Sequence, residues 1–163
     1  MDENTATTRA ALDGDGLLAH WLGHRRLTRR TIEAFPEEAL FAYHAPGMRS
    51  FGAMIHEVDT LLPIALQGAA EGTWRWPREY ASSAPADKAE LLAAFDVATA
   101  DLETTLPRIS SERFLAVDRP LPAREEPVVA TLLYFLDNEI HHRAQGFVYL
   151  RELGIEPPAF HRR

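Results

Sequence analysis

The sequence of 163 residues contains no cysteine, and this absence removes several kinds of chemistry at once. It excludes disulfide bonds, a cysteine nucleophile and thiolate metal ligands, so a bound metal would need histidine, carboxylate, amide or water ligands. No apolar run approaches the roughly 18 residues of a membrane span. Residues 1–15 also lack the basic start and apolar stretch of a signal peptide. We therefore expect a cytoplasmic protein that does not enter a membrane.

Internal repeats and low-complexity segments are also missing, and basic residues are outnumbered by acidic ones. The net charge of −7 argues against nucleic acid as the main partner. With 46% hydrophobic and 25% charged residues, the composition is that of one globular domain. We expect residues 1–15 to form a flexible tail and residues 16–163 to form this domain.

Four segments have the apolar spacing of amphipathic helices. They are predicted to run from an N-cap at Asp15 to Phe35, from an N-cap at Ser50 to Gly68 or Gly72, from Asp87 to Leu106, and from Pro127 to Leu153. Pro63 is expected to kink or split the second helix. Residues 110–126 are expected to be irregular, with a short extended piece around 114–117. Four helices with connections of mixed length predict an all-α four-helix bundle.

Two further features concern histidines and aromatic side chains. His20 and His24 lie four residues apart on the first helix, but His24 faces its apolar side and is more typical of a hydrogen-bonded core histidine than of a ligand. The connection after the second helix carries three aromatic residues, Trp74, Trp76 and Tyr80. This loop either folds back over the bundle or forms the wall of a small-molecule pocket, and the sequence does not separate the two.

The last predicted helix has an unusual polar stripe. At 3.6 residues per turn the following residues share one side: Thr131, Tyr134, Asn138, His141, His142, Gln145, Tyr149 and Glu152. The opposite side is expected to face the core through Leu133, Leu136, Ile140, Ala144 and Phe147. A solvated stripe is usually built from Lys and Glu, so we favour the interpretation that this one lines an internal polar site.

Several sequence blocks resemble the DinB superfamily of DinB/YfiT-like metalloenzymes. They are Met48-Arg49-Ser50-Phe51, Ile55-His56, the block from Asn138 to Gln145 and the block from Tyr149 to Pro158. The resemblance extends over most of the chain. It implies a four-helix bundle in up-down-down-up order, commonly a homodimer. It also implies three histidines that bind a divalent metal, often nickel or zinc. His56 and His142 match two of these histidines, and Asn138 stands in place of the third.

The resemblance further implies a metal-dependent thiol S-transferase or hydrolase that acts on a small electrophile with a low-molecular-weight thiol. The partner would be that small molecule or thiol, not nucleic acid or a membrane. His141 and Tyr134 are candidate acid–base groups, although His141 is equally typical of a core or interface histidine. An amide oxygen is a poorer ligand than imidazole for zinc or nickel. Asn138 therefore leaves alternatives open: weak or water-mediated binding, or substitution by His141, Glu139 or His24.

A last alternative is that the metal site has been lost. The chain would then be a small-ligand-binding or stress-associated bundle without catalytic activity.

Overall fold

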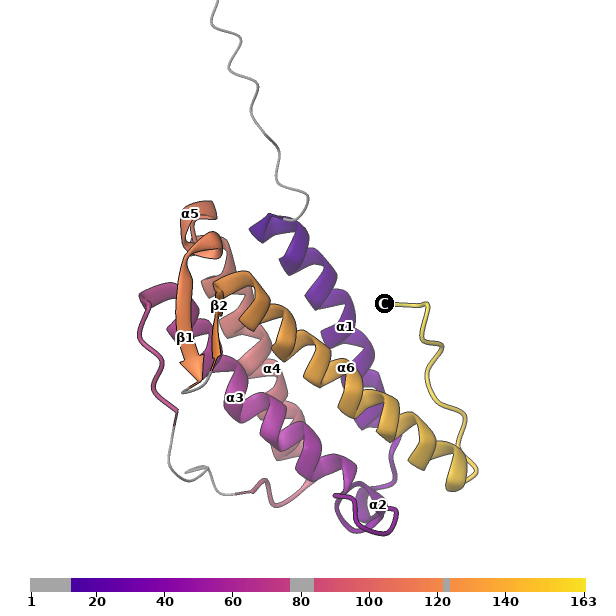
Figure 1. The fold of residues 1–163 in the computed structure, drawn as a ribbon. Coiled ribbons are helices and arrows are strands. Elements are labelled where there is room, and N and C mark those ends of the chain that lie inside the picture. The colour runs from indigo at the N-terminus through magenta and orange to yellow at the C-terminus, as the bar shows by residue number, and fades with distance from the viewer. Residues whose placement is uncertain (1–12, 77–83, 122–123) are drawn as a thin grey trace, which may run out of the picture.

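The structure, a computed structural model, describes residues 13–76, 84–121 and 124–163. Four long helices pack side by side in it: α1 (Gly14–Ala34), α3 (Phe51–Glu71), α4 (Lys88–Thr105) and α6 (Val128–Glu152) (Figure 1). The shorter elements are α2 (Glu37–Ala42), η1 (Leu106–Arg108), α5 (Ser111–Leu115), β1 (Val117–Leu121) and β2 (Arg124–Pro127). Within the described residues no helix is both long and apolar enough to cross a membrane.

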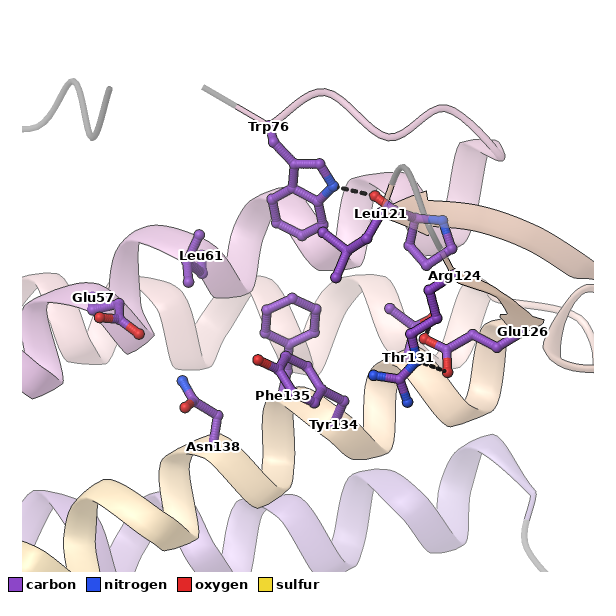
Figure 2. A pocket seen from close by; sticks show the side chains of 11 residues that line it. Glu57, Leu61, Trp76, Leu121, Arg124, Glu126, Thr131, Tyr134, Phe135 and Asn138 are labelled. Carbon is purple, nitrogen blue, oxygen red and sulfur yellow. Dashed lines mark hydrogen bonds and ion pairs between the residues drawn. The ribbon is translucent and has the colours of Figure 1, made fainter. Parts of the chain in front are cut away.

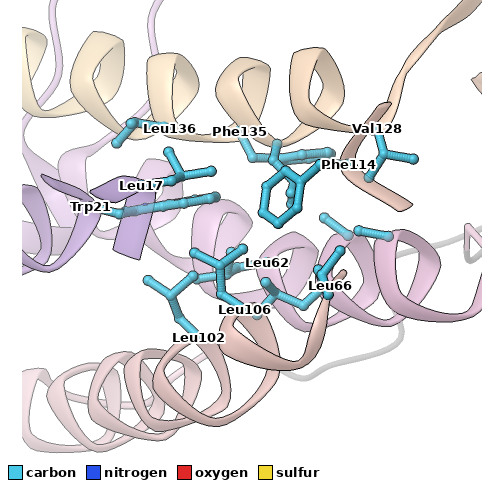
Figure 3. Close-up of a cluster of buried hydrophobic side chains, with 14 of the residues drawn as sticks. Leu17, Trp21, Leu62, Leu66, Leu102, Leu106, Phe114, Val128, Phe135 and Leu136 are labelled. Carbon is cyan, nitrogen blue, oxygen red and sulfur yellow. The ribbon is translucent and has the colours of Figure 1, made fainter. Parts of the chain in front are cut away.

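Two hydrophobic clusters define the directions of the four helices. One cluster joins the first turns of α1 and α6 to the last turns of α3 and α4, through residues that include Leu17, Leu66, Leu102 and Leu132 (Figure 3). The second cluster joins the opposite ends of the same helices. Helices α1 and α6 therefore run one way and α3 and α4 the other, which is the predicted up-down-down-up order.

Local signals in the sequence set most of the helix ends. Ser50 and Asp87 cap α3 and α4 through their side chains, and α3 ends at Gly72 with φ of 74°. The predicted cap of the first helix was wrong by two residues, because Asp13, not Asp15, accepts the hydrogen bond from Gly16. The predicted tail therefore overlaps α1 at residues 14 and 15, and residues 1–12 lie outside the described residues.

Pro63 lies inside α3 and does not split it. The turns on both sides of Pro63 are held in the core by Leu62 and Leu66, each of which is 1% exposed. Packing of these neighbours compensates for the backbone hydrogen bond that proline removes.

The segment expected to be irregular contains an antiparallel hairpin in which β1 pairs with β2. Arg113 ties this hairpin to α3, since its Nε donates to the Ala69 carbonyl at 2.7 Å and its Nη1 to Asp118 Oδ1 at 2.9 Å. Trp74 Nε1 donates to Asp118 Oδ2 at 2.7 Å. The hairpin is thereby fixed over the end of α3 and the start of α6.

A layer of buried charged side chains separates the two hydrophobic clusters. Arg25 is 1% exposed, and its Nη2 donates to Asp59 Oδ1 at 3.0 Å and to the Phe95 carbonyl at 2.8 Å. Glu139 is fully buried and accepts hydrogen bonds from Trp21 Nε1 at 3.1 Å and Thr28 Oγ1 at 2.6 Å. All four long helices contribute to this layer.

The core-facing side of α6 differs from the predicted one. Its buried residues are Val128, Thr131, Leu132, Phe135, Leu136, Glu139, His142, Arg143, Gly146, Tyr149 and Leu150. Of the predicted core residues on this helix only Leu136 is buried, and Ala144 is exposed. Compared with the prediction, α6 is rotated about its axis, because Glu139 and Arg143 face inward and take part in the buried charged layer. A prediction from apolar spacing assigns such charged residues to the surface.

Candidate functional site

A cavity of about 370 Å³ lies between α3, α6 and the β1–β2 hairpin. Figure 2 shows that side chains from all three enclose it. The lining consists of Glu57, Leu61, Trp76, Pro120, Leu121, Arg124, Glu126, Thr131, Tyr134, Phe135 and Asn138. Three members of the polar stripe predicted on α6, Thr131, Tyr134 and Asn138, therefore face this internal space.

One wall of the cavity is aromatic. The ring of Trp76 stacks on Phe135, with centroids 5.6 Å apart, and on Trp74, with centroids 6.0 Å apart. Trp76 Nε1 donates to the Pro120 carbonyl of the hairpin. The loop after α3 thus does both things that the sequence left open, since it folds back over the bundle and forms a pocket wall. Tyr80 lies outside the described residues.

The hairpin end of the cavity contains polar groups that satisfy one another. Glu126 accepts a hydrogen bond from Thr131 Oγ1 at 2.8 Å and pairs with Arg124 Nε at 2.8 Å. The Arg124 guanidinium carbon lies 5.6 Å from the centroid of the Tyr134 ring. This end is therefore closed by an internally paired group of charges.

The opposite end, here called the Asn138 end, is formed by Glu57, Asn138 and the adjoining His142. Glu57 Oε1 lies 3.6 Å from His142 Nε2, and Glu57 Oε2 is paired with Arg49. The nearby imidazole of His142 and then the Arg49 guanidinium lower the pKa of Glu57 to about 2. The carboxylate is therefore ionised at neutral pH.

Several polar atoms at the Asn138 end have no hydrogen-bond partner among the described residues. His142 is 7% exposed, and its buried Nε2 makes no hydrogen bond, while its Nδ1 lies 3.4 Å from Gln145 Oε1. The Asn138 amide makes no side-chain hydrogen bond within the described part of the chain and points into the cavity (Figure 2). This end can accept hydrogen bonds or ligate a cation.

The structure places His56 away from this end of the cavity. His56 lines a separate hollow between α3 and α4, together with Asp59, Glu90 and Val97. Glu57, one residue and about 100° further round the helix, is the α3 side chain that contacts His142. Across the described ranges, no group of three or more histidine or acidic side chains is arranged to hold a metal ion.

The other candidate residues lie in different surroundings. Tyr134 lines the cavity and is 45% exposed, whereas His141 is exposed on α6 and contacts Gln145. His24 belongs to the buried layer, where its Nδ1 accepts a hydrogen bond from Arg143 at 2.9 Å. Burial, followed by the positive charge of Arg143, lowers the pKa of His24 to about 4. His24 is thus a neutral core histidine and does not reach the cavity.

The residues that the sequence did not single out are Glu57 and the hairpin residues Arg124 and Glu126. Glu57 and Leu61 lie four residues apart and therefore on the same side of α3. This spacing could have indicated that Glu57, and not His56, is on the side of α3 that faces His142. The hairpin residues carried no such signal, because their strands lack a regular apolar alternation.

Comparisons with known proteins agree with this architecture. A DinB-like protein from Bacillus cereus has a TM-score of 0.72 at 20% identity, covering 89% of this chain and 95% of that chain. A DinB-like protein from Bacillus subtilis, YjoA, has a TM-score of 0.72 at 21% identity, covering 88% of this chain and 96% of that chain. None of the curated proteins compared with the chain matched it. The DinB family model matches residues 4–163, and the chain therefore belongs to the DinB family.

Proposed function

We propose that this DinB-family protein binds a small organic molecule in the cavity between α3, α6 and the hairpin. The observation that carries the proposal is the cavity itself. Its volume of about 370 Å³ lies within the range typical of small-molecule sites. Apolar side chains such as Leu61, Trp76 and Phe135 form most of the wall, and a few polar groups converge at its two ends. That combination of an apolar wall with placed polar groups is characteristic of ligand pockets.

The binding test screens a library of neutral aromatic and aliphatic fragments against ¹⁵N-labelled protein by NMR. A ligand in the cavity should shift the indole N–H resonance of Trp76 and the side-chain amide of Asn138, and leave that of the buried Trp21 in place. Leu61→Trp should fill the cavity and abolish the shifts. Leu115→Trp is the matched control, because Leu115 is 73% exposed and lies outside the cavity lining. Absence of any fragment binding at millimolar concentration would overturn the proposal.

A second candidate function is the metal-dependent thiol transfer or hydrolysis that the family suggests. One observation favours it: the buried His142 Nε2 has no hydrogen-bond partner and lies 3.6 Å from Glu57 Oε1. Two ligands bound at about 2.1 Å in a tetrahedral site are roughly 3.4 Å apart, so this pair fits a divalent ion. Glu57, His142 and Asn138 would hold it, and the bound metal would lower the pKa of a water or thiol.

The residues that hold such a metal can be tested by metal analysis of protein purified without a chelator or a histidine tag. On the structure, His142→Ala and Glu57→Gln should each remove a bound metal, whereas His56→Ala should retain it. If His56 is a ligand, as the sequence resemblance implies, His56→Ala should also remove the bound metal. The absence of metal at any supplied nickel or zinc concentration would leave the small-molecule function as the remaining candidate.

A further inference from the structure

The Asn138 end of the cavity is built around the Glu57 carboxylate, with the Asn138 amide and the imidazole of His142 beside it. Gln145 Nε2 lies 2.9 Å from His141 Nε2 and donates to it, so Gln145 Oε1 is the atom that faces His142 Nδ1. A carbonyl oxygen can only accept, which places the His142 proton on Nδ1. Nε2 then faces Glu57 Oε1, as a lone pair in the neutral ring and as a donor in the protonated ring.

One oxygen of the Glu57 carboxylate is left for a ligand. Glu57 Oε1 lies 3.6 Å from His142 Nε2 and accepts no hydrogen bond within the described residues. The pairing of Glu57 with Arg49 uses the other carboxylate oxygen, and the Arg49 side chain is 51% exposed. The Asn138 amide, beside Glu57 in the cavity lining, has an oxygen and an NH2 group that make no hydrogen bond within the described residues. A carboxylate oxygen and an amide oxygen at one end of a cavity favour a ligand group that carries several donors or a positive charge.

We propose that this end binds the ammonium group of an organic amine whose flat apolar body lies along Trp76 and Phe135. The inference rests on the proposed small-molecule function and specifies its ligand class. An ammonium group has three N–H donors, which suit the Glu57 carboxylate and the Asn138 amide oxygen in the cavity lining. The aromatic wall attracts a cation through its ring faces and an apolar body through burial.

The charges of the lining favour a cation over an anion. Glu57 and Glu126 are negative and Arg124 is the one positive side chain among the lining residues. Arg124 is paired with Glu126, and the Arg49 that pairs with Glu57 is half exposed and lies outside the lining, so the carboxylate of Glu57 is the charge nearest a ligand at this end. A bare metal ion would satisfy the acceptors but would leave most of the cavity of about 370 Å³ unfilled.

The experiment compares three indoles of matched shape by isothermal titration calorimetry: cationic tryptamine, neutral tryptophol and anionic indole-3-acetate. The protein is first treated with a chelating resin. Tryptamine should bind at least about 10-fold more tightly than tryptophol, because a charge-assisted hydrogen bond is lost in the alcohol. Indole-3-acetate should bind most weakly, since its carboxylate would face Glu57.

Variants test the residues that carry the inference. Glu57→Gln keeps the shape of the side chain and should abolish the preference for tryptamine over tryptophol. Glu125→Gln is the matched control, because Glu125 is an exposed hairpin carboxylate outside the cavity lining. Asn138→Leu provides a second probe if Glu57→Gln folds poorly, and should reduce tryptamine affinity more than tryptophol affinity.

Three results would overturn the amine assignment. The first is equal binding of tryptamine and tryptophol, or a preference that survives Glu57→Gln. The second is binding of neutral fragments in the NMR screen without binding of any indole, which would leave the small-molecule function intact. The third is nickel binding that depends on Glu57 and His142 and that tryptamine does not displace. Failure of every fragment and every indole would overturn both proposals together.

Discussion

At the scale of single residues, Asn138 decides how well the Asn138 end can hold a metal. Replacing Asn138 by His would place two imidazoles four residues apart on α6, facing the carboxylate of Glu57. Two histidines and one glutamate form a known zinc ligand set. We expect Asn138→His to raise zinc or nickel affinity by about 10-fold or more.

Calorimetric titration with zinc and nickel chloride measures this change. Val148→His is the control, since Val148 is exposed on α6, has no histidine three or four residues away and is not in the cavity lining. If Asn138→His binds metal no better than the Val148 variant, then Glu57, Asn138 and His142 do not share a metal-binding geometry.

Asp59 gives the folded protein a pH dependence. Its Oδ2 is buried without a partner, and burial raises the pKa from 3.8 to about 7 against the opposing charge of Arg25. Between those pH values the folded state binds more protons than the unfolded state. The stability contributed by protonated Asp59 is therefore present below pH 4 and lost as the pH rises through 7.

We expect wild-type stability, relative to that of Asp59→Asn, to fall between pH 5 and pH 8, with a slope of up to about 1.4 kcal/mol per pH unit. Urea unfolding followed by circular dichroism at four pH values measures it. Asp137→Asn, which changes an exposed carboxylate, should leave the pH profile unchanged. A constant difference between wild type and Asp59→Asn would show that Asp59 titrates normally.

At this scale the sequence pointed to some residues of the candidate site and not to others. His142 and Asn138 stood out because their residue types are unusual on a helix face and because they lie in a block that resembles the DinB superfamily. Glu57 was overlooked because glutamate is common on helix surfaces, and the adjacent His56 was the more conspicuous residue. Only the rotation of α3 against α6 decides which of the two faces His142, and that rotation is set by packing across the whole helix pair.

At the scale of elements, Gly146 allows α6 to approach α3 closely. A Cβ atom at Gly146 would lie 2.6 Å from ring atoms of Phe51, which is 0% exposed and has no room to move. Gly146→Ala gains at most about 1 kcal/mol of helix propensity. The overpacking costs about 1–3 kcal/mol, so we expect net destabilisation.

Thermal unfolding of Gly146→Ala beside wild type measures this effect, and Gly146→Ala combined with Phe51→Leu tests its cause. The smaller side chain at Phe51 should remove most of the added penalty, because it frees the space that the new methyl group needs. A Gly146→Ala variant more stable than wild type would mean that helix propensity outweighs the contact and that α3 and α6 separate easily.

The helices were predictable and the hairpin was not, for a physical reason. Three of the four long helices have side-chain N-caps and the fourth begins after Pro127, and these signals act within a few residues of the chain. The strands read Val-Asp-Arg-Pro-Leu and Arg-Glu-Glu-Pro, so neither has an alternating apolar side. What fixes the hairpin is distant in sequence: Asp118 accepts from Trp74, and the Pro120 carbonyl accepts from Trp76.

At the scale of the whole molecule, the bundle has two hydrophobic cores with a charged layer between them. Amphipathic patterns assign charged residues to the surface, so they could not reveal that Arg25, Glu139 and Arg143 are buried. The layer forms only when four helices are in register. A one-turn slip of any helix would separate charges that have no access to water, which favours a single alignment of the bundle.

Removal of one member of this layer tests that view. Arg25→Met keeps an unbranched apolar stem in place of the aliphatic part of the side chain but leaves Asp59 and Glu139 without the cation that contacts both, at 3.0 Å and 3.5 Å. Breaking a buried ion pair by removing one partner costs about 3–5 kcal/mol, and we expect a loss of this size in the free energy of unfolding. Chemical denaturation measures it directly.

The exposed Arg29 supplies the comparison, because its pairs with Glu33 and Asp96 lie at the surface and should contribute less than about 1 kcal/mol. The double variant Arg25→Met, Asp59→Asn should then lose less stability than the sum of its two single variants, since each single variant already removes the same Arg25–Asp59 ion pair. Additive losses, or a loss in Arg25→Met no larger than that in Arg29→Met, would mean that water reaches the layer. In that case the charges would not set the alignment of the four helices.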